Sequence, residues 1–110
     1  MMDFDQYQKL ARSTAVYPDL GNNYVYPVLG LGGEAGEIQE KIKKVIRDKN
    51  GMIDNETREA IKLELGDLLW YLSNLASELK LSLKDIAQSN IAKLVSRTER
   101  NKIHGEGDER

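Results

Sequence analysis

Hydrophobic side chains recur along this chain with the spacing of an α-helix. Between about residues 28 and 49 they follow one another at intervals of three and four, which places them on one face of a helix. These positions are Val28, Leu31, Ala35, Ile38, Ile42, Val45 and Ile46. Similar patterns predict three more helices. The first covers residues 3–15, the next begins after a capping residue, Asp54 or Asn55, and the last covers about residues 83–101. Nothing alternates like a strand, so we predict an all-α fold, a four-helix bundle.

Length, composition and charge limit the number of domains, the kinds of partner and the cellular location that we expect. The 110 residues suit a single domain over residues 1–110, with a polar tail at residues 102–110. A chain this short buries a modest core, so we expect oligomerisation to complete the bundle. A net charge of −2 provides no overall attraction to nucleic acid or to a membrane surface. Cysteine is absent, the first residues do not resemble a signal peptide, and no apolar run could span a membrane. A cytoplasmic location is expected.

An acidic pattern occurs twice, thirty residues apart. Glu-Ala-Gly-Glu-Ile begins at Glu34, and Glu-Leu-Gly-Asp-Leu begins at Glu64. At ~100° per residue, Glu34 and Glu64 occupy matching positions at the edge of the apolar face. Glu37 and Asp67 lie farther out on the same flank. If the two helices pack antiparallel, the four carboxylates can meet, and their repulsion would raise their pKa values unless a cation lies between them.

The ligand chemistry of such a site favours a hard cation. Oxygen ligands without cysteine or an internal histidine suit Mg²⁺, Mn²⁺ or Ca²⁺. Gly36 and Gly66 hold matching positions inside the two helices, where glycine costs about 1 kcal/mol relative to alanine. They indicate close approach of another helix or of a ligand. The alternative is two solvated helix faces, but the register-matched duplication favours the metal.

Two other metal sites fit the sequence poorly. A di-iron bundle needs Glu-x-x-His pairs, whereas the only histidine, His104, lies in the tail. The segment that begins at Asp48 resembles the start of an EF-hand loop. Its glycine comes too early, however, and Met52 and Ile53 occupy ligand positions.

A polar face on the last predicted helix suits a phosphate chain. Its residues follow a 3-4-3 spacing and are Asn90, Lys93, Arg97 and Arg100. A cation bound by the carboxylates and a basic face opposite it would together hold a polyphosphate. The alternative is a solvated basic face, which is also how we interpret most of Lys41, Lys43 and Lys44.

Several aromatic residues are candidates for contact with a nucleoside. Tyr71 lies one turn beyond Asp67 on the acidic flank, and it is either a nucleoside contact or a tyrosine at the edge of the core. Tyr24 and Tyr26 either stack on a base or anchor the loop of residues 17–26. Trp70 points away from the apolar face of its helix, so we expect it in a subunit interface or against the last helix.

Taken in order, these motifs resemble those of the MazG-like nucleoside triphosphate pyrophosphohydrolases. The resemblance rests on residues 30–37, 64–71 and 90–94 and extends over about residues 24–110, and the ending is similar to the compact, single-domain members of bacteria and phages. It implies an obligate dimer or a dimer of dimers. It also implies that the metal-binding carboxylates are Glu34, Glu37, Glu64 and Asp67, that Asn90 and Lys93 contact the phosphates, and that Tyr71 lies near the nucleotide. The family pattern has a glutamate where this chain has Gly33.

We therefore expect an enzyme that uses Mg²⁺, or Mn²⁺ as a substitute, to cut a nucleoside triphosphate between the α and β phosphates. Glu34, Glu37 and Lys93 are the expected catalytic residues. Glu37 would accept a proton from the attacking water, and Lys93, aided by Arg97, would stabilise charge on the phosphates. The loop of residues 17–26 would select the base or sugar. Two alternatives stay open: a nucleotide-binding regulatory module that has lost catalysis, suggested by Gly33, and a structural helical dimer without a ligand.

Overall fold

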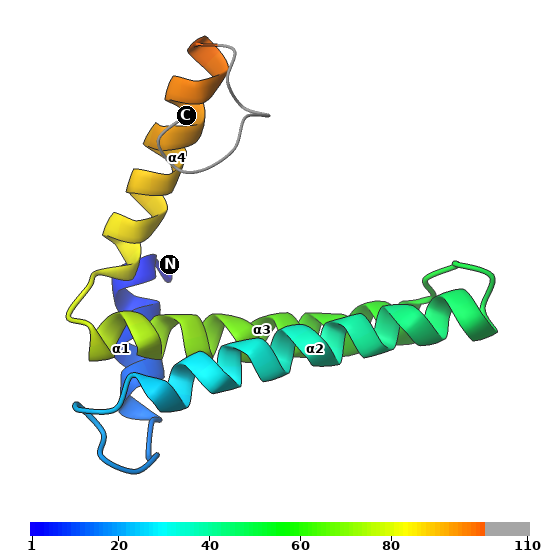
Figure 1. The fold of residues 1–110 in the computed structure, drawn as a ribbon, viewed down its shortest axis with the longest axis horizontal. Coiled ribbons are helices and arrows are strands. Elements are labelled where there is room, and N and C mark those ends of the chain that lie inside the picture. The colour runs from blue at the N-terminus through cyan, green and yellow to red at the C-terminus, as the bar shows by residue number, and fades with distance from the viewer. Residues whose placement is uncertain (101–110) are drawn as a thin grey trace.

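The computed structural model describes residues 1–100, which form four α-helices and, within that range, no strand (Figure 1). The helices are α1 (Phe4–Ser13), α2 (Val25–Asp48), α3 (Asn55–Glu78) and α4 (Leu83–Glu99). The predicted all-α fold is confirmed. The predicted polar tail, with His104, lies outside the described residues. None of the helices within residues 1–100 has the length and hydropathy needed to cross a membrane.

Helix α2 begins three residues before the start expected from the apolar pattern. Pro27 lies in its first turn, where the backbone N–H of a residue has no helical acceptor, so a proline there removes no hydrogen bond. The side chain of Asn23 caps this end instead, since its Oδ1 accepts a hydrogen bond from the backbone N–H of Tyr26 at 3.1 Å. The loop before α2 is therefore shorter than the sequence indicated.

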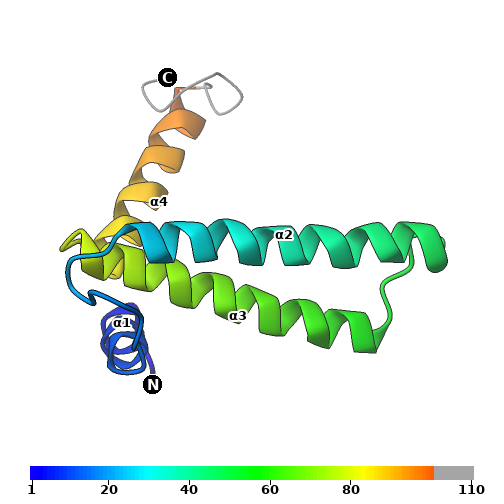
Figure 2. The ribbon, with the colours of Figure 1, turned by 60° about the horizontal axis from the view of Figure 1, so that its bottom comes forward.

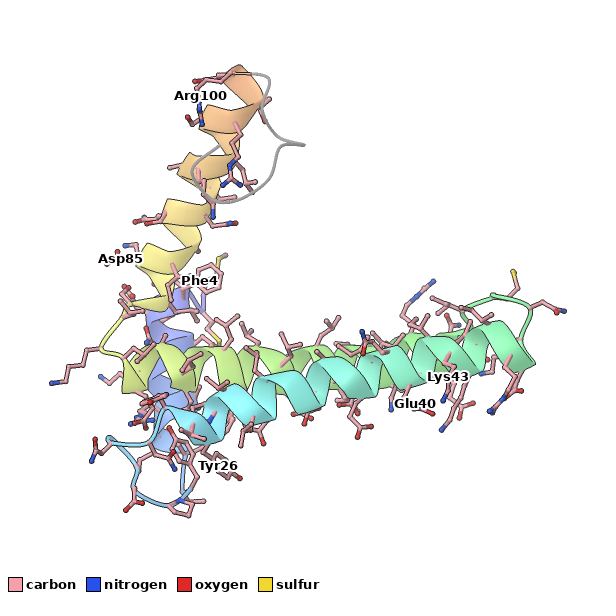
Figure 3. The ribbon with its side chains drawn as sticks, in the orientation of Figure 1. Phe4, Tyr26, Glu40, Lys43, Asp85 and Arg100 are labelled. Atoms are coloured by element: carbon pink, nitrogen blue, oxygen red, sulfur yellow. The ribbon has the colours of Figure 1, made fainter. Side chains whose placement is uncertain are left out.

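Helices α2 and α3 form a long antiparallel pair that carries the rest of the fold (Figures 1 and 2). A tight turn joins them, in which Asn50 and Gly51 adopt positive φ angles of 53° and 77°. Asp54 caps the start of α3 by accepting a hydrogen bond from the backbone N–H of Thr57 at 2.8 Å. The exposed side of α2 carries the ion pair of Glu40 and Lys43, labelled in Figure 3. The inner edges of this pair are where the acidic residues lie.

Helix α1 crosses α3 near its C-terminal end and also contacts the start of α4. Gln8 on α1 fixes the link between α3 and α4. Its Nε2 donates to the carbonyl oxygen of Leu81 at 2.9 Å, and its Oε1 accepts from the backbone N–H of Leu83 at 2.8 Å. Phe4 lies in the angle between α1 and α4 (Figure 3). These contacts set the direction in which α4 leaves the core.

Helix α4 extends away from the α2–α3 pair in both views (Figures 1 and 2). Its apolar residues Ile91 and Val95 are exposed, as are Leu29 on α2 and Leu63 on α3. The four helices of one chain therefore do not close around a common core. Closure of the bundle by oligomerisation stays a prediction.

Candidate active site

Three of the four predicted metal-binding carboxylates meet between α2 and α3. Glu34 comes from α2, and Glu64 and Asp67 come from α3. One oxygen of each lies within 4.8 Å of one oxygen of the others. The antiparallel packing of two helices with matching acidic flanks brings them together, as their spacing predicted. We call Glu34, Glu64 and Asp67 the acidic group.

Glu37, the fourth predicted ligand and the predicted base, is exposed one turn farther along α2. It is not a member of the acidic group. Its negative charge nevertheless contributes to raising the pKa of Glu34, so it lies within electrostatic range. Its roles as ligand and base stay predictions.

The acidic group is strained electrostatically. A hydrogen bond with Glu64, burial and the neighbouring carboxylate charges raise the pKa of Glu34 to about 7. The same hydrogen bond lowers the pKa of Glu64, against the effect of burial. These opposite shifts are expected where two carboxylates lie too close together to ionise independently.

One carboxylate oxygen of the acidic group is buried without a hydrogen-bond partner. Oε2 of Glu34 is buried and has no hydrogen-bond partner within the described residues. A buried polar atom without a partner is rare in native proteins. A hard divalent cation among these carboxylates would give that oxygen a ligand bond and would offset the repulsion between the negative charges. The residues present therefore fit a Mg²⁺ or Mn²⁺ ion.

A lysine also belongs to this site. Nζ of Lys41 lies 3.4 Å from Oε1 of Glu64, across the gap between the helices. The sequence analysis predicts a mostly solvated Lys41, but this residue follows Glu34 by seven positions and so lies on the same flank of α2. That spacing was the available signal. Lys41 offsets part of the negative charge at one end of the acidic group.

An aromatic row borders the acidic group, consisting of Tyr17, Tyr26 and Tyr71. The rings of Tyr17 and Tyr26 stack at a centroid distance of 4.7 Å and an interplanar angle of 13°, and Tyr71 follows at 6.4 Å from Tyr26. Burial, Tyr26 and the charges of Glu34 and Asp67 all raise the pKa of Tyr71. Tyr71 therefore lies near the acidic group, as expected from its place one turn beyond Asp67. Tyr24 is exposed and takes no part in the row.

Two further aromatic residues approach the site from directions that the sequence does not reveal. Burial and the charge of Asp67 raise the pKa of Tyr7, which places this residue of α1 near the acidic group. Trp70 was expected in a subunit interface or against the last helix. Instead its Nε1 donates to Oγ1 of Thr14, at the end of α1, at 2.8 Å. Both contacts depend on how α1 crosses α3.

The two matching glycines of the acidic pattern do not contact another helix within residues 1–100, and close approach of a ligand to them stays a prediction. A Cβ atom at Gly36 or Gly66 would meet no heavy atom within 4 Å, so neither residue allows a close approach within the chain. The close approach occurs at Gly30. A Cβ atom there would lie 2.5 Å from Cζ of Tyr71 and closer still to Cε1 and Cδ1. Gly30 thus lets the ring of Tyr71 lie against the backbone of α2.

The predicted phosphate-binding residues lie on α4, apart from the acidic group of the same chain (Figure 1). Asn90 and Lys93 line a surface hollow near the start of α4. Arg97 is buried, and Arg100 donates from Nε to the carbonyl oxygen and the hydroxyl of Ser96, so it is occupied on its own helix. Within residues 1–100, one chain therefore does not bring these residues of α4 to its own acidic group.

The chain is similar to known proteins over most of its length. A model of the MazG nucleotide pyrophosphohydrolase domain matches residues 27–101. The chain belongs to this family. It is also 45% identical over 114 residues to the "Gene 37 protein" of Mycobacterium phage L5, a match that covers 99% of this chain and all of that protein. No solved structure gives a significant match.

The MazG match has an informative start. It begins at Pro27 in the first turn of α2, so it includes the acidic group, Gly30, Tyr71 and α4. It leaves out α1 and the segment that leads into α2. Two of the three tyrosines in the aromatic row, Tyr17 and Tyr26, therefore precede the matched region.

Proposed function

We propose that this protein is a metal-dependent nucleoside triphosphate pyrophosphohydrolase that cuts its substrate between the α and β phosphates. Membership of the MazG family supports the reaction class. The observation that carries the proposal is the acidic group, in which oxygens of three carboxylates lie within 4.8 Å of one another and a buried oxygen of Glu34 lacks a partner within residues 1–100. Carboxylate oxygens grouped in this way suit a hard divalent cation, which can also bind phosphate oxygens.

Glu34, Glu64 and Asp67 would hold the ion, Mg²⁺ or Mn²⁺, with Glu37 as a further ligand or as the base. When bound, such an ion neutralises phosphate oxygens and lowers the pKa of water. Glu37 is exposed at the edge of the acidic group, where its carboxylate can accept a proton from an attacking water. The water oxygen bonds to one of the two phosphorus atoms beside the bridging oxygen, the bond from that phosphorus to the bridging oxygen breaks, and the monophosphate and pyrophosphate separate.

The residues of α4 supply the positive side of the site. Asn90 and Lys93 would contact the phosphate oxygens, and Arg97 would support Lys93 in stabilising the charge that develops on them. Because α4 points away from the acidic group of its own chain, we assign these residues to the site of a second copy. The exposed apolar residues Ile91 and Val95 on α4 fit such an interface. The expected assembly is a homodimer or a dimer of dimers.

The activity is tested with a panel of nucleoside and deoxynucleoside triphosphates in the presence of Mg²⁺, with product chromatography as the readout. We expect a monophosphate and pyrophosphate from at least one substrate, and none from Glu64→Gln. Glu40→Gln, on the exposed side of α2, is the matched control and should retain activity. If the wild-type protein releases no pyrophosphate from any of these nucleotides, the proposal is wrong.

The assignment of α4 to a second copy has its own test. Glu64→Gln and Lys93→Ala should each be inactive alone. If α4 completes the site of the partner, mixed dimers contain one intact site, and mixing the two variants restores part of the activity. No recovery after subunit exchange, shown by exchange of differently labelled chains, would place both residues in the site of a single chain.

A second candidate function is a regulatory module that binds nucleotide without hydrolysis. The observation that favours it is Gly33, where the family pattern has a glutamate. A Cβ atom at Gly33 would meet no heavy atom within 4 Å, so packing within the chain does not require glycine there. Nucleotide binding without turnover in the wild type, with turnover in Gly33→Glu, would favour this module over the enzyme.

A further inference from the structure

We propose that Glu78 is a positioning residue for the nucleoside end of the substrate. It holds the segment of residues 15–24 against α3, and this segment places Tyr26 beside Tyr71 at the border of the acidic group. The inference rests on the proposed function and adds to it a residue that decides how the nucleoside is held.

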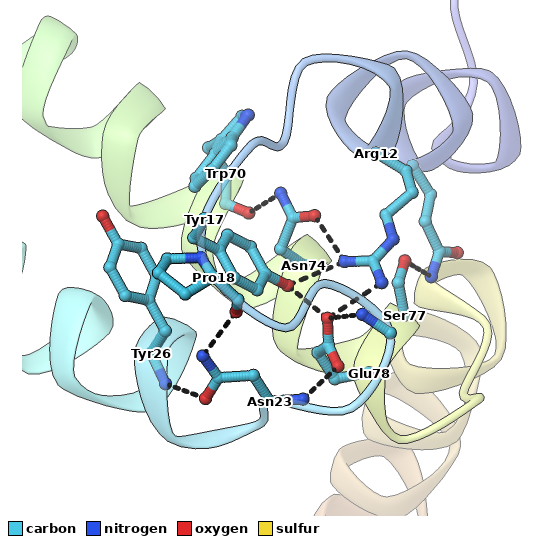
Figure 4. Close-up of polar contacts among 11 residues, drawn as sticks. Arg12, Tyr17, Pro18, Asn23, Tyr26, Trp70, Asn74, Ser77 and Glu78 are labelled. Atoms are coloured by element: carbon cyan, nitrogen blue, oxygen red, sulfur yellow. Dashed lines mark hydrogen bonds and ion pairs between the residues drawn. The ribbon is translucent and has the colours of Figure 1, made fainter.

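Glu78 is surrounded by donors from the N-terminal part of the chain (Figure 4). Its side chain is only 1% exposed. Oε2 accepts hydrogen bonds from Nη2 of Arg12 at 2.8 Å, from the hydroxyl of Tyr17 and from the backbone N–H of Gly21 at 2.9 Å. Oε1 accepts from the backbone N–H of Asn23 at 2.8 Å. One carboxylate thus ties down four points between residues 12 and 23.

A second set of hydrogen bonds carries this constraint into the first turn of α2. Asn23 donates from Nδ2 to the carbonyl oxygen of Pro18 at 2.8 Å and accepts from the backbone N–H of Tyr26 at 3.1 Å. Arg12 also donates from Nη1 to the hydroxyl of Tyr17 at 2.7 Å and to Oδ1 of the fully buried Asn74 at 3.2 Å. The path from Glu78 to Tyr26 therefore runs through Asn23.

The ring of Tyr26 depends on the same anchor from its other side. It stacks on Tyr17, whose hydroxyl donates to Glu78. Tyr17 is buried, whereas Tyr26 is 43% exposed and so keeps surface for a ligand. Tyr71 is held in place separately, by its contact with Gly30. A change at Glu78 should therefore move Tyr26 relative to Tyr71.

The position of the aromatic row suggests what it contacts. The phosphates are expected at the acidic group, and the row begins beside it at Tyr71. A nucleoside attached to those phosphates would then reach Tyr26, and aromatic side chains offer bases a stacking surface. The donors around Glu78 all precede the region that matches the MazG domain, as Tyr26 does. The segment that positions Tyr26 thus lies outside the matched domain.

A purely structural role for Glu78 makes a different prediction from a positioning role. Loss of a structural anchor would lower the melting temperature and the amount of active protein, which reduces the apparent kcat for every substrate alike. Loss of nucleoside positioning would raise KM for the nucleotide and leave kcat nearly unchanged. It would also reduce differences in KM among nucleotides that differ in their base.

The experiment compares the wild type with Glu78→Gln and Asn23→Ala, with Glu40→Gln as a control variant. The kcat and KM values are measured for each hydrolysed nucleotide at saturating Mg²⁺, after the folded fraction is determined by circular dichroism. For Glu78→Gln and Asn23→Ala we expect KM to rise about tenfold or more, the size of a lost stacking contact, with kcat within about threefold of the wild type. Glu40→Gln should match the wild type in both values.

The outcomes separate this inference from the proposed function. If the wild type hydrolyses a nucleotide and KM is unchanged in folded Glu78→Gln, Glu78 does not position the nucleoside. Should Glu78→Gln fail to fold, Asn23→Ala and Tyr17→Phe together decide the question, because they cut the two connections from Glu78 to Tyr26 and leave the carboxylate in place. An unchanged KM in the folded double variant would refute the positioning role. A wild type that releases no pyrophosphate refutes the proposed function and this inference together.

Discussion

Replacing Gly30 by alanine should force apart two surfaces that the structure holds in contact. The added Cβ atom would lie 2.5 Å from Cζ of Tyr71 and closer to two other atoms of the ring. Carbon atoms in contact are about 3.5–4.0 Å apart, so the ring has to retreat by roughly 1 Å or more. The ring of Tyr71 packs against α2, and it cannot move away from Gly30 without losing that packing. Either the ring turns outwards or α2 and α3 separate locally.

The size of the effect follows from two opposing contributions. Forcing extra volume into a packed contact costs about 1–3 kcal/mol. Alanine inside a helix is more stable than glycine by about 1 kcal/mol. Gly32→Ala isolates the second contribution, because a Cβ atom at Gly32 in the same helix meets no heavy atom within 4 Å. The free energy of unfolding of Gly30→Ala should therefore lie about 1–3 kcal/mol below that of Gly32→Ala.

Chemical denaturation at one fixed protein concentration measures both variants under the same assembly conditions. Tyr71→Ala provides the double-mutant cycle, because removing the ring should remove the penalty of Gly30→Ala. Equal stabilities of Gly30→Ala and Gly32→Ala would refute the contact between Gly30 and Tyr71. So would a penalty at Gly30 that persists without the ring.

Three further predictions follow from the polar contacts. Burial raises the pKa of Glu78, but the hydrogen bonds that its carboxylate accepts outweigh this effect and lower the pKa from 4.5 to about 2. The wild type should therefore lose stability as the pH falls from 4.5 to about 2. Denaturation at stepped pH should show this loss, and Glu78→Gln should lack that part of it. Mg²⁺ at 100 times its Kd should add about 2.7 kcal/mol to the stability of the wild type and so raise its melting temperature. This rise should be absent in Glu64→Gln. Thr14→Val should cost about 1 kcal/mol and shift the fluorescence of Trp70, since it removes the hydrogen bond from Nε1; unchanged emission would contradict that contact.

The helices and most of the acidic group could be predicted because both depend on spacing along one helix. Residues three, four or seven positions apart share a helix face whatever the rest of the chain does. For this reason Glu34, Glu64 and Asp67 could be placed together once α2 and α3 were expected to pack antiparallel. The start of α2 was misjudged because Pro27 was interpreted as part of the loop, although a proline in the first turn breaks no helical hydrogen bond.

The contacts made by α1 and by the segment before α2 were not predictable in this way. The residues that donate to Glu78 are 55 to 66 positions away from it, and a glutamate near the end of a helix usually looks solvated. Trp70 was expected in a subunit interface or against the last helix, and its indole N–H instead donates to Thr14. Which element covers it depends on how α1 crosses α3, and no periodic pattern contains that angle. The direction of α4 is set by the hydrogen bonds of Gln8 to the link after α3, which is equally non-local.

The direction of α4 has a consequence for how activity depends on protein concentration. If each site takes its carboxylates from one chain and its lysine from another, an isolated chain has no complete site. Specific activity would then depend on the total amount of protein and would fall steeply on dilution below the Kd of the dimer. A cell that makes few copies would keep its nucleotides intact, and hydrolysis would begin only once synthesis passes a threshold.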